Sequence, residues 1–285
     1  MHHPLKVKLI RAYFAIVSYL FPALAVLSAY RLFHHPVNTK RKNAKEKKVP
    51  APQRFIIKVD EKIQLQAYRW GEADHPPVLL VHGWSTTSRS MSNFLDLLLR
   101  NDFQVISYDA VQHGESEGKA SDLAGWADSV RAVMRETGPV KCIIAHSFGA
   151  AAVTVASKLG LDTRKLVLVA PIHDIIEVAD RFAERLGIPK KIVEEMRDYT
   201  WAQNKTNFHK YGKDWKDILH SNFHVPTLIF HDVGDREIGI EHSRQLCQLW
   251  PWAVLRKTKG LGHRKILDDG DVAKEIVAFI KNGSE

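Results

Sequence analysis

Residues 140–153 read VKCIIAHSFGAAAV, an apolar run that passes through a single serine into a stretch of small residues. The run Val140–Ala145 predicts a buried strand, and the alanine-rich stretch that follows predicts a helix. A serine on a sharp strand-to-helix turn projects its hydroxyl above the sheet, and the turn needs small residues two before and two after it. Ala145 and Gly149 meet this requirement, so Ser147 is a candidate nucleophile.

Strand and helix patterns alternate on both sides of this stretch. An antiparallel hairpin is expected first, over Phe55–Val59 and Ile63–Trp70. Further strands are expected at Val78–His82, Phe103–Tyr108, Val140–Ala145, Lys165–Ala170, Pro226–His231 and Ala253–Arg256, with helices near Met91–Arg100, Leu123–Arg135, Gly149–Leu159 and Val272–Ile280. Apolar strands that alternate with helices predict an α/β fold, with one doubly wound and mostly parallel sheet.

The alternation lapses over residues 172–223, where amphipathic patterns such as IIEVADRFAERLG and KIVEEMRDYTWAQ predict helices. We expect this interval to form a helical cap over one end of the sheet. The folded core is expected to begin after the linker Pro50-Ala51-Pro52. The predicted organisation is therefore a basic N-terminal arm (1–50), a core (51–171 and 224–285) and a cap (172–223).

The net charge of +9 comes from the N-terminal arm. Residues 1–50 hold ten Lys or Arg and one acid, Glu46, which leaves 31 basic and 31 acidic residues in the rest of the chain. The folded core is thus neutral, and a nucleic-acid partner is not expected. The two cysteines, Cys142 and Cys247, lie in apolar surroundings that indicate free structural thiols rather than a disulfide or a metal site.

The arm contains a hydrophobic segment, residues 12–30, that carries no charge over nineteen positions. Three interpretations stay open: a segment packed on the protein or lying at a membrane surface, a spanning helix, and a cleaved signal ending at Ala23-Leu24-Ala25. A spanning helix would leave the catalytic domain on the cytoplasmic side, because more basic residues follow the segment than precede it. Lys40–Lys48 then predicts a solvated linker, or alternatively a segment attracted to anionic lipid.

Three more loops at the carboxyl ends of predicted strands carry candidate site residues, since such loops meet in one crevice. His82-Gly83-Trp84-Ser85 follows one strand, and the backbone amides of Trp84 and Phe148 are the expected donors of an oxyanion hole. Three acids compete for a second role after Pro226–His231, and we favour Asp235 over Asp232 and Glu237 as the carboxylate that orients a histidine. His263, in the loop Gly260-Leu261-Gly262-His263, is the expected base.

From Phe55 to the C-terminus these motifs resemble the α/β-hydrolase superfamily. The segment Asp109–Ser116 is similar to the D-x-P-G-H-G-x-S motif of that superfamily, although Val111-Gln112 replaces the familiar Pro-Gly and Ala145 replaces the first glycine around the nucleophile. The resemblance implies an eight-stranded sheet, a helical cap and a triad of Ser147, Asp235 and His263. It implies that Asp109 and His113 are structural.

The predicted function is that of a serine hydrolase, carboxylesterase-like or lipase-like, which cleaves an ester-like acyl bond through an acyl-enzyme. Its expected partner is a small-molecule acyl substrate, with a membrane surface as a further partner of the arm. No cofactor and no metal are expected. The alternative is a non-catalytic homologue, tethered at a membrane, that binds a ligand or a partner protein.

Overall fold

The computed structural model describes residues 4–36, 50–118, 121–221 and 223–282. The described chain forms two compact units. One unit holds the N-terminal helices and residues Asp174–Ile218, and is called here the helical unit. The other, called the sheet unit, holds the sheet and its flanking helices, up to His173 and again from Leu219. The predicted linker Lys40–Lys48 lies outside the described residues.

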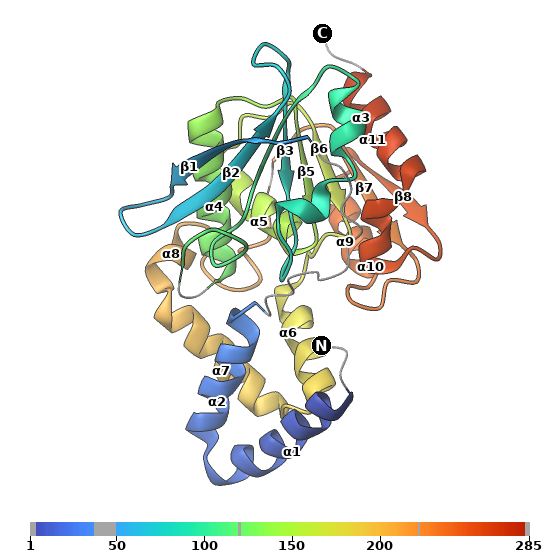
Figure 1. The fold of residues 1–285 in the computed structure, drawn as a ribbon. Helices are drawn as coiled ribbons and strands as arrows, with labels where there is room; N and C mark the ends of the chain where they lie inside the picture. Colours follow the sequence, from blue (N-terminus) through green and yellow to red (C-terminus); the bar gives the residue numbers. More distant parts are fainter. Residues whose placement is uncertain (1–3, 37–49, 119–120, 222, 283–285) are drawn as a thin grey trace. The chain divides into compact units, whose positions relative to one another are not determined.

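Among the described residues the sheet has eight strands in the order β1-β2-β4-β3-β5-β6-β7-β8 (Figure 1). Their bounds are β1 Gln53–Lys58, β2 Gln64–Trp70, β3 Pro77–Val81, β4 Gln104–Tyr108, β5 Cys142–His146, β6 Leu166–Val169, β7 Thr227–Asp232 and β8 Ala253–Thr258. The pairs β1–β2 and β2–β4 are antiparallel, whereas every pair from β4 through β8 is parallel. The prediction of a doubly wound, mostly parallel, eight-stranded sheet is confirmed.

Helices cover both faces of this sheet. Those of the sheet unit are α3 Leu95–Leu99, α4 Leu123–Thr137, α5 Phe148–Ser157, α9 Glu241–Leu249, α10 Gly262–Lys265 and α11 Gly270–Lys281, with short 3-10 turns η1 Ser88–Met91 and η2 Ile266–Asp268. The expected helix over Met91–Arg100 is thus limited to α3. Before α3 the backbone forms tighter turns, since the amides of Ser92, Phe94 and Leu95 each donate to the carbonyl three residues earlier.

The core explains why these helices lie where they do. On one face, alternate strand residues such as Leu80, Ile144 and Phe230 pack against α3 and α11. On the other, α5 is buried along its whole length and packs against α4. Burial of α5 on all sides is possible because its small alanine side chains let neighbouring backbones approach closely.

Strand register brings the candidate loops to one edge of the sheet. Val81 at the end of β3 pairs with Ala145 of β5, and His146 pairs with Val169 at the end of β6. Asp232 at the end of β7 pairs with Thr258 at the end of β8. Since these strands are parallel, the loops that follow β3, β5, β7 and β8 emerge on the same side.

The helical unit contains α1 Pro4–Leu20, α2 Pro22–His34, α6 Ile175–Leu186, α7 Lys190–Gln203 and α8 Lys205–His209. Small residues of α2, including Ala25 and Ala29, share a buried core with Ala179 and Ala183 of α6 and with residues of α7. The N-terminal arm therefore packs on the inserted segment. That the insertion caps the sheet stays a prediction.

The predicted apolar segment 12–30 is divided between two helices rather than continuous. Phe21 leaves the helical conformation, with φ −140° and ψ 67°, and Pro22 begins α2. Proline is favoured at a first helical position, and its ring excludes the preceding residue from a continuing helix. Within the described residues, no helix combines the length and the apolarity that crossing a bilayer requires.

Candidate active site

Ser147 occupies a strained turn between β5 and α5. Its φ of 52° and ψ of −119° lie in a region that L-residues rarely adopt. The turn is held by its backbone, since the Ser147 amide donates to the carbonyl of Val169 at 3.0 Å and its own carbonyl accepts from Ala150 at 2.9 Å. Such a conformation costs about 1–3 kcal/mol and persists only where the surroundings impose it. It holds the hydroxyl clear of both strand and helix.

Two glycines allow the turn at Ser147 to form. A Cβ at Gly149 would lie 2.2 Å from the carbonyl oxygen of His82, and a Cβ at Gly83 would lie 2.7 Å from Nδ1 of His146. Either atom would force the loop after β3 away from the nucleophile. Ala145 is completely buried, so the methyl group that replaces the usual first glycine is accommodated.

The three predicted side chains meet above this edge. Nε2 of His263 lies 2.9 Å from Oγ of Ser147, and Nδ1 of His263 lies 2.7 Å from Oδ2 of Asp235. Because a carboxylate only accepts, Nδ1 carries the proton and donates to Asp235. Nε2 is then free to accept the proton of the Ser147 hydroxyl.

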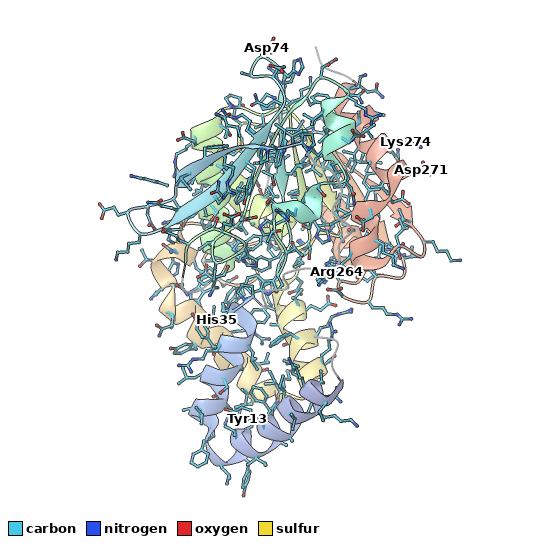
Figure 2. The ribbon with its side chains drawn as sticks, viewed as in Figure 1. Tyr13, His35, Asp74, Arg264, Asp271 and Lys274 are labelled. Carbon is cyan, nitrogen blue, oxygen red and sulfur yellow. The ribbon has the colours of Figure 1, made fainter. Side chains whose placement is uncertain are left out.

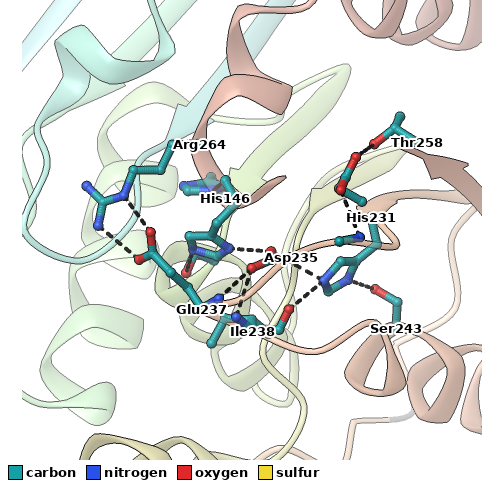
Figure 3. Close-up of polar contacts among 12 residues, drawn as sticks. His146, His231, Asp235, Glu237, Ile238, Ser243, Thr258 and Arg264 are labelled. Atoms are coloured by element: carbon teal, nitrogen blue, oxygen red, sulfur yellow. Dashed lines mark hydrogen bonds and ion pairs between the residues drawn. The ribbon is translucent and has the colours of Figure 1, made fainter. Parts of the chain in front are cut away.

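The carboxylate of Asp235 is almost fully enclosed and receives four donors (Figure 3). Oδ1 accepts from the amides of Glu237 at 2.8 Å and Ile238 at 3.0 Å, and Oδ2 faces His263 and His231. Burial by itself would raise the pKa of Asp235, but the hydrogen bonds from the two histidines and from Ile238 outweigh it and hold the pKa well below its usual value. The group is therefore an anion at neutral pH.

Asp232, the rival acid, has a different set of partners. Its Oδ1 accepts from the Gly234 amide, and its Oδ2 accepts from the Leu261 amide and the Thr258 hydroxyl, each at 2.9 Å. Burial raises the pKa of Asp232, but these donors lower it further than burial raises it. Asp232 thus joins the loop after β7 to the loop that carries His263, without contacting the imidazole.

A salt bridge between Arg264 and Glu237 joins the same two loops. Both guanidinium nitrogens of Arg264 that face Glu237 lie 3.0 Å from its carboxylate oxygens. Glu237, the least favoured of the three candidate acids, is thus the partner of Arg264, the residue that follows His263. A bidentate pair of this kind fixes orientation as well as distance.

Two further histidines lie at the site, His231 and His146, and neither was predicted from the sequence to be a site residue. His231 is completely buried, with Nδ1 2.6 Å from the Ser243 hydroxyl and Nε2 3.1 Å from the Ile238 carbonyl and 3.5 Å from Asp235 Oδ2. The neighbours of Nε2 only accept, so Nε2 carries the proton and Nδ1 accepts from Ser243. His231 is a positioning residue for Asp235, and its place at the end of a buried strand was the available signal.

His146, next to Ser147, forms a hydrogen bond with the loop that carries His263. Its Nε2 lies 2.9 Å from the backbone carbonyl of His263, to which it donates, and burial holds its pKa well below the usual value. A neutral imidazole at this point contributes a hydrogen bond without placing a second positive charge beside His263.

The candidate oxyanion donors are held by aromatic packing. The rings of Trp84 and Phe148 lie edge to face at 5.2 Å, and both contact Trp126. Phe148 is the first residue of α5, so its amide lies outside the helical hydrogen-bond pattern. Across the described chain neither of these two amides has an acceptor. Backbone amides without an acceptor are the donors that an oxyanion hole requires.

Asp109 and His113 hold the loop that carries Trp84. Asp109 Oδ1 accepts from the Ser88 amide at 2.9 Å, and His113 Nε2 accepts from the Ser85 amide at 3.1 Å. Burial lowers the pKa of His113 to about 3, so it is neutral and donates from Nδ1 to Val111. The structural role expected for both residues agrees with these contacts.

The sequence matches known proteins across the same region. Residues 78–275 match the alpha/beta hydrolase family. A bifunctional esterase/perhydrolase of Acinetobacter calcoaceticus is 25% identical over 49% of this chain and 52% of its own length, so the chain spans about half of that relative. A non-heme chloroperoxidase of Streptomyces lividans is 27% identical over 75% of this chain and 94% of its own length.

Solved structures share the fold at lower identity. An esterase of Pyrococcus furiosus is 15% identical with a TM-score of 0.64, and the match covers 84% of this chain and 96% of that one. An esterase of Rhodococcus sp. is 17% identical with a TM-score of 0.61, over 81% and 99%. The match from β3 into α11, with the same fold in these structures, confirms the predicted superfamily: the chain belongs to the alpha/beta hydrolase family.

Proposed function

We propose that the protein is a serine hydrolase that cleaves ester-like acyl bonds, with Ser147 as nucleophile, His263 as general base and Asp235 as the residue that orients the base. The observation that carries the proposal is the unbroken chain of contacts from Ser147 Oγ through His263 to Asp235, at 2.9 Å and 2.7 Å. The positive φ of Ser147 adds to it, because strained backbone conformations concentrate at active sites.

The reaction proceeds in two steps. Ser147 Oγ attacks the acyl carbon while His263 Nε2 takes its proton, and the amides of Trp84 and Phe148 stabilise the oxyanion. The intermediate collapses with transfer of that proton to the leaving alkoxide, which releases the alcohol and leaves an acyl-serine. Water, deprotonated by His263, then attacks the acyl-serine, and His263 returns that proton to Ser147 Oγ as the carboxylic acid is released. The anionic Asp235 stabilises the imidazolium formed in each step.

Carboxylic esters are the proposed substrate class, carboxylesterase-like or lipase-like. Hydrolysis of an ester requires no group beyond the triad and two oxyanion donors, since His263 protonates the leaving oxygen and an alcohol departs more readily than an amine. The relatives named as an esterase/perhydrolase and as esterases are in keeping with this chemistry.

A fluorophosphonate probe tests the proposal, because it reacts with activated serine hydroxyls. We expect covalent labelling of the wild-type protein and of a Ser90→Ala control, and none of Ser147→Ala. A series of p-nitrophenyl esters of graded chain length then defines the acyl preference. A folded wild type that neither labels nor cleaves any ester would refute the proposal and favour the non-catalytic, ligand-binding alternative.

Perhydrolysis is a second candidate activity, favoured by the match to the chloroperoxidase over 94% of that protein and by the name of the esterase/perhydrolase. Hydrogen peroxide would replace water in the second step, so that the acyl-serine yields a peracid rather than an acid. The test is peracid formation from an ester and hydrogen peroxide by the wild type. Its absence, while ester hydrolysis persists, would exclude the second activity and leave the first.

A further inference from the structure

The two N-terminal helices expose an unusual amount of large apolar surface. Tyr19 is 85% exposed, and eight further large apolar residues of α1, α2 and the turn between them are also exposed: Leu5, Leu9, Tyr13, Ile16, Leu20, Phe21, Leu24 and Leu27. We call these nine residues the apolar stripe. Large exposed apolar patches on soluble proteins mark surfaces that bind a partner or a membrane. Figure 2 labels one member, Tyr13, on the N-terminal helices.

The stripe is distinct from the face that α1 uses for its own packing. Leu5, Leu9, Tyr13, Ile16 and Leu20 follow one another at intervals of three or four residues, so they share one side of the helix. Phe14, which is completely buried, lies on a different side of the helix, and the partly buried Ile10 and Val17 lie next to it. Helix α1 is therefore apolar on two faces, and α6 and α7 of the helical unit account for only one of them.

The charge around the stripe has one sign. Helices α1 and α2 contain Lys6, Lys8, Arg11 and Arg31 and no aspartate or glutamate. All four basic residues are exposed, but Arg11 lies on the side of α1 that faces α6, where its Nε donates to the carbonyl of Arg185. The charges that border the stripe are therefore Lys6, Lys8 and Arg31, and Arg31 follows Leu24 and Leu27 at helical spacing. The sequence after α2 continues the same charge with six basic residues between Lys40 and Lys48, against Glu46 alone.

We propose that the apolar stripe docks on the surface of an anionic lipid bilayer, with α1 and α2 lying in the headgroup region. An apolar stripe bordered by lysine and arginine is the pattern of helices that lie in a membrane interface. The aromatic residues Tyr13, Tyr19 and Phe21 suit this depth, where a ring meets hydrocarbon on one side and water on the other. The break at Pro22 folds α2 back onto α1, where the Tyr13 hydroxyl lies 2.7 Å from that of Ser28, so both helices contribute residues to the stripe.

A second copy of the chain fits the stripe less well than a bilayer. In a symmetric dimer the same face of each chain would meet, so the basic residues of the two copies would be brought together. With no acid on α1 or α2 to offset them, the like charges would repel. An anionic bilayer instead supplies both apolar surface and negative charge.

Flotation of the chain of residues 1–285 with vesicles tests the proposal. We expect binding to vesicles that contain phosphatidylglycerol, weaker binding to pure phosphatidylcholine, and loss of the difference at high salt. Leu9→Ser and Ile16→Ser should each lower the partition coefficient about tenfold, equivalent to about 1.4 kcal/mol. Lys6→Gln and Lys8→Gln should each lower it about fivefold on anionic vesicles alone, since a basic residue contributes about 1 kcal/mol at such a surface.

Matched controls separate the stripe from general adhesion. Leu159→Ser and Leu249→Ser remove similarly exposed leucines from the sheet unit and should leave vesicle binding unchanged. Circular dichroism verifies that each variant keeps its helices. The flotation is repeated with Ser147→Ala, which should bind as the wild type does, so that failure of the proposed catalytic activity leaves this test intact.

Three outcomes would overturn the proposal. The first is a wild type that does not float with anionic vesicles. The second is binding that the stripe variants and the control variants reduce equally. The third is a stripe-dependent dimer, seen by light scattering in the wild type and lost in Ile16→Ser, with no vesicle binding.

Discussion

The two aspartates after β7 provide a sharp test of the site, because they lie three residues apart and have separate partners. In Asp235→Asn the side-chain oxygen can still accept from the amides of Glu237 and Ile238, which leaves the NH2 group facing His263. That NH2 group can only donate, so Nδ1 of His263 must give up its proton and become an acceptor. Nε2 then carries the proton and can no longer accept from Ser147. The same change in the serine-protease triad lowers kcat about 10⁴-fold, which corresponds to about 5.4 kcal/mol of transition-state stabilisation.

Asp232→Asn should instead act mainly on stability. An amide cannot accept at both of its ends, so either Gly234 or Leu261 loses the acceptor of its backbone N–H. One unsatisfied backbone donor costs about 1–3 kcal/mol. We therefore expect the free energy of unfolding to fall by about 2 kcal/mol and kcat to fall less than about tenfold, because the contact of His263 with Asp235 is retained.

The assay compares kcat on the best p-nitrophenyl ester with the midpoint of urea unfolding for the wild type and both variants. The expected pattern is a large loss of kcat for Asp235→Asn and a small loss for Asp232→Asn, with stability lowered in both, since the donors that lower the pKa of each carboxyl also stabilise the fold. The reasoning is refuted if folded Asp232→Asn loses more activity than Asp235→Asn, or if both variants lose activity equally at equal stability.

Three further results are expected. Gly149→Ala should lose most activity and about 1–3 kcal/mol of stability, because the added methyl meets the His82 carbonyl, whereas Gly270→Ala, with open space around it, should change neither; equal unfolding midpoints for the two variants would contradict this. Lys165→Met should lower the unfolding midpoint through loss of about 2 kcal/mol, since the ammonium donates to the carbonyls of Phe279, Ile280 and Asn282 at the end of α11; an unchanged midpoint would show that these carbonyls find other donors. Burial lowers the pKa of His34 to about 4, so the contribution of His34 to the free energy of unfolding, up to about 3 kcal/mol, is complete above pH 6.5 and is lost as the pH falls towards 4. Urea unfolding at pH 7 and pH 5 should show a smaller loss of stability at pH 5 for His34→Gln than for the wild type. Equal losses would contradict the assignment.

The sequence alone was sufficient for the fold class and for the order of the candidate site residues. Local patterns carry this information, since a strand-to-helix turn with small residues around Ser147 has few other uses, and apolar strands alternating with helices can only be buried in a parallel sheet. The preference for Asp235 over Asp232 was also a prediction from the sequence, but the contact with His263 that distinguishes the two acids is visible only in the structure.

The tertiary structure decided how the site is supported and where the N-terminal arm lies. The supporting contacts form only when β5, β7 and β8 lie in register; they are those of His231, His146 and the pair Glu237–Arg264. The chain has fifteen histidines, and no local pattern indicates which of them this register brings next to the triad. Likewise, an apolar segment has the same sequence pattern whether it crosses a bilayer or packs on helices that are distant along the chain. The difference lies in Pro22, which divides the segment, and in the small side chains of α6 that receive Phe14, Ala25 and Ala29, and such long-range complementarity exists only in the folded chain.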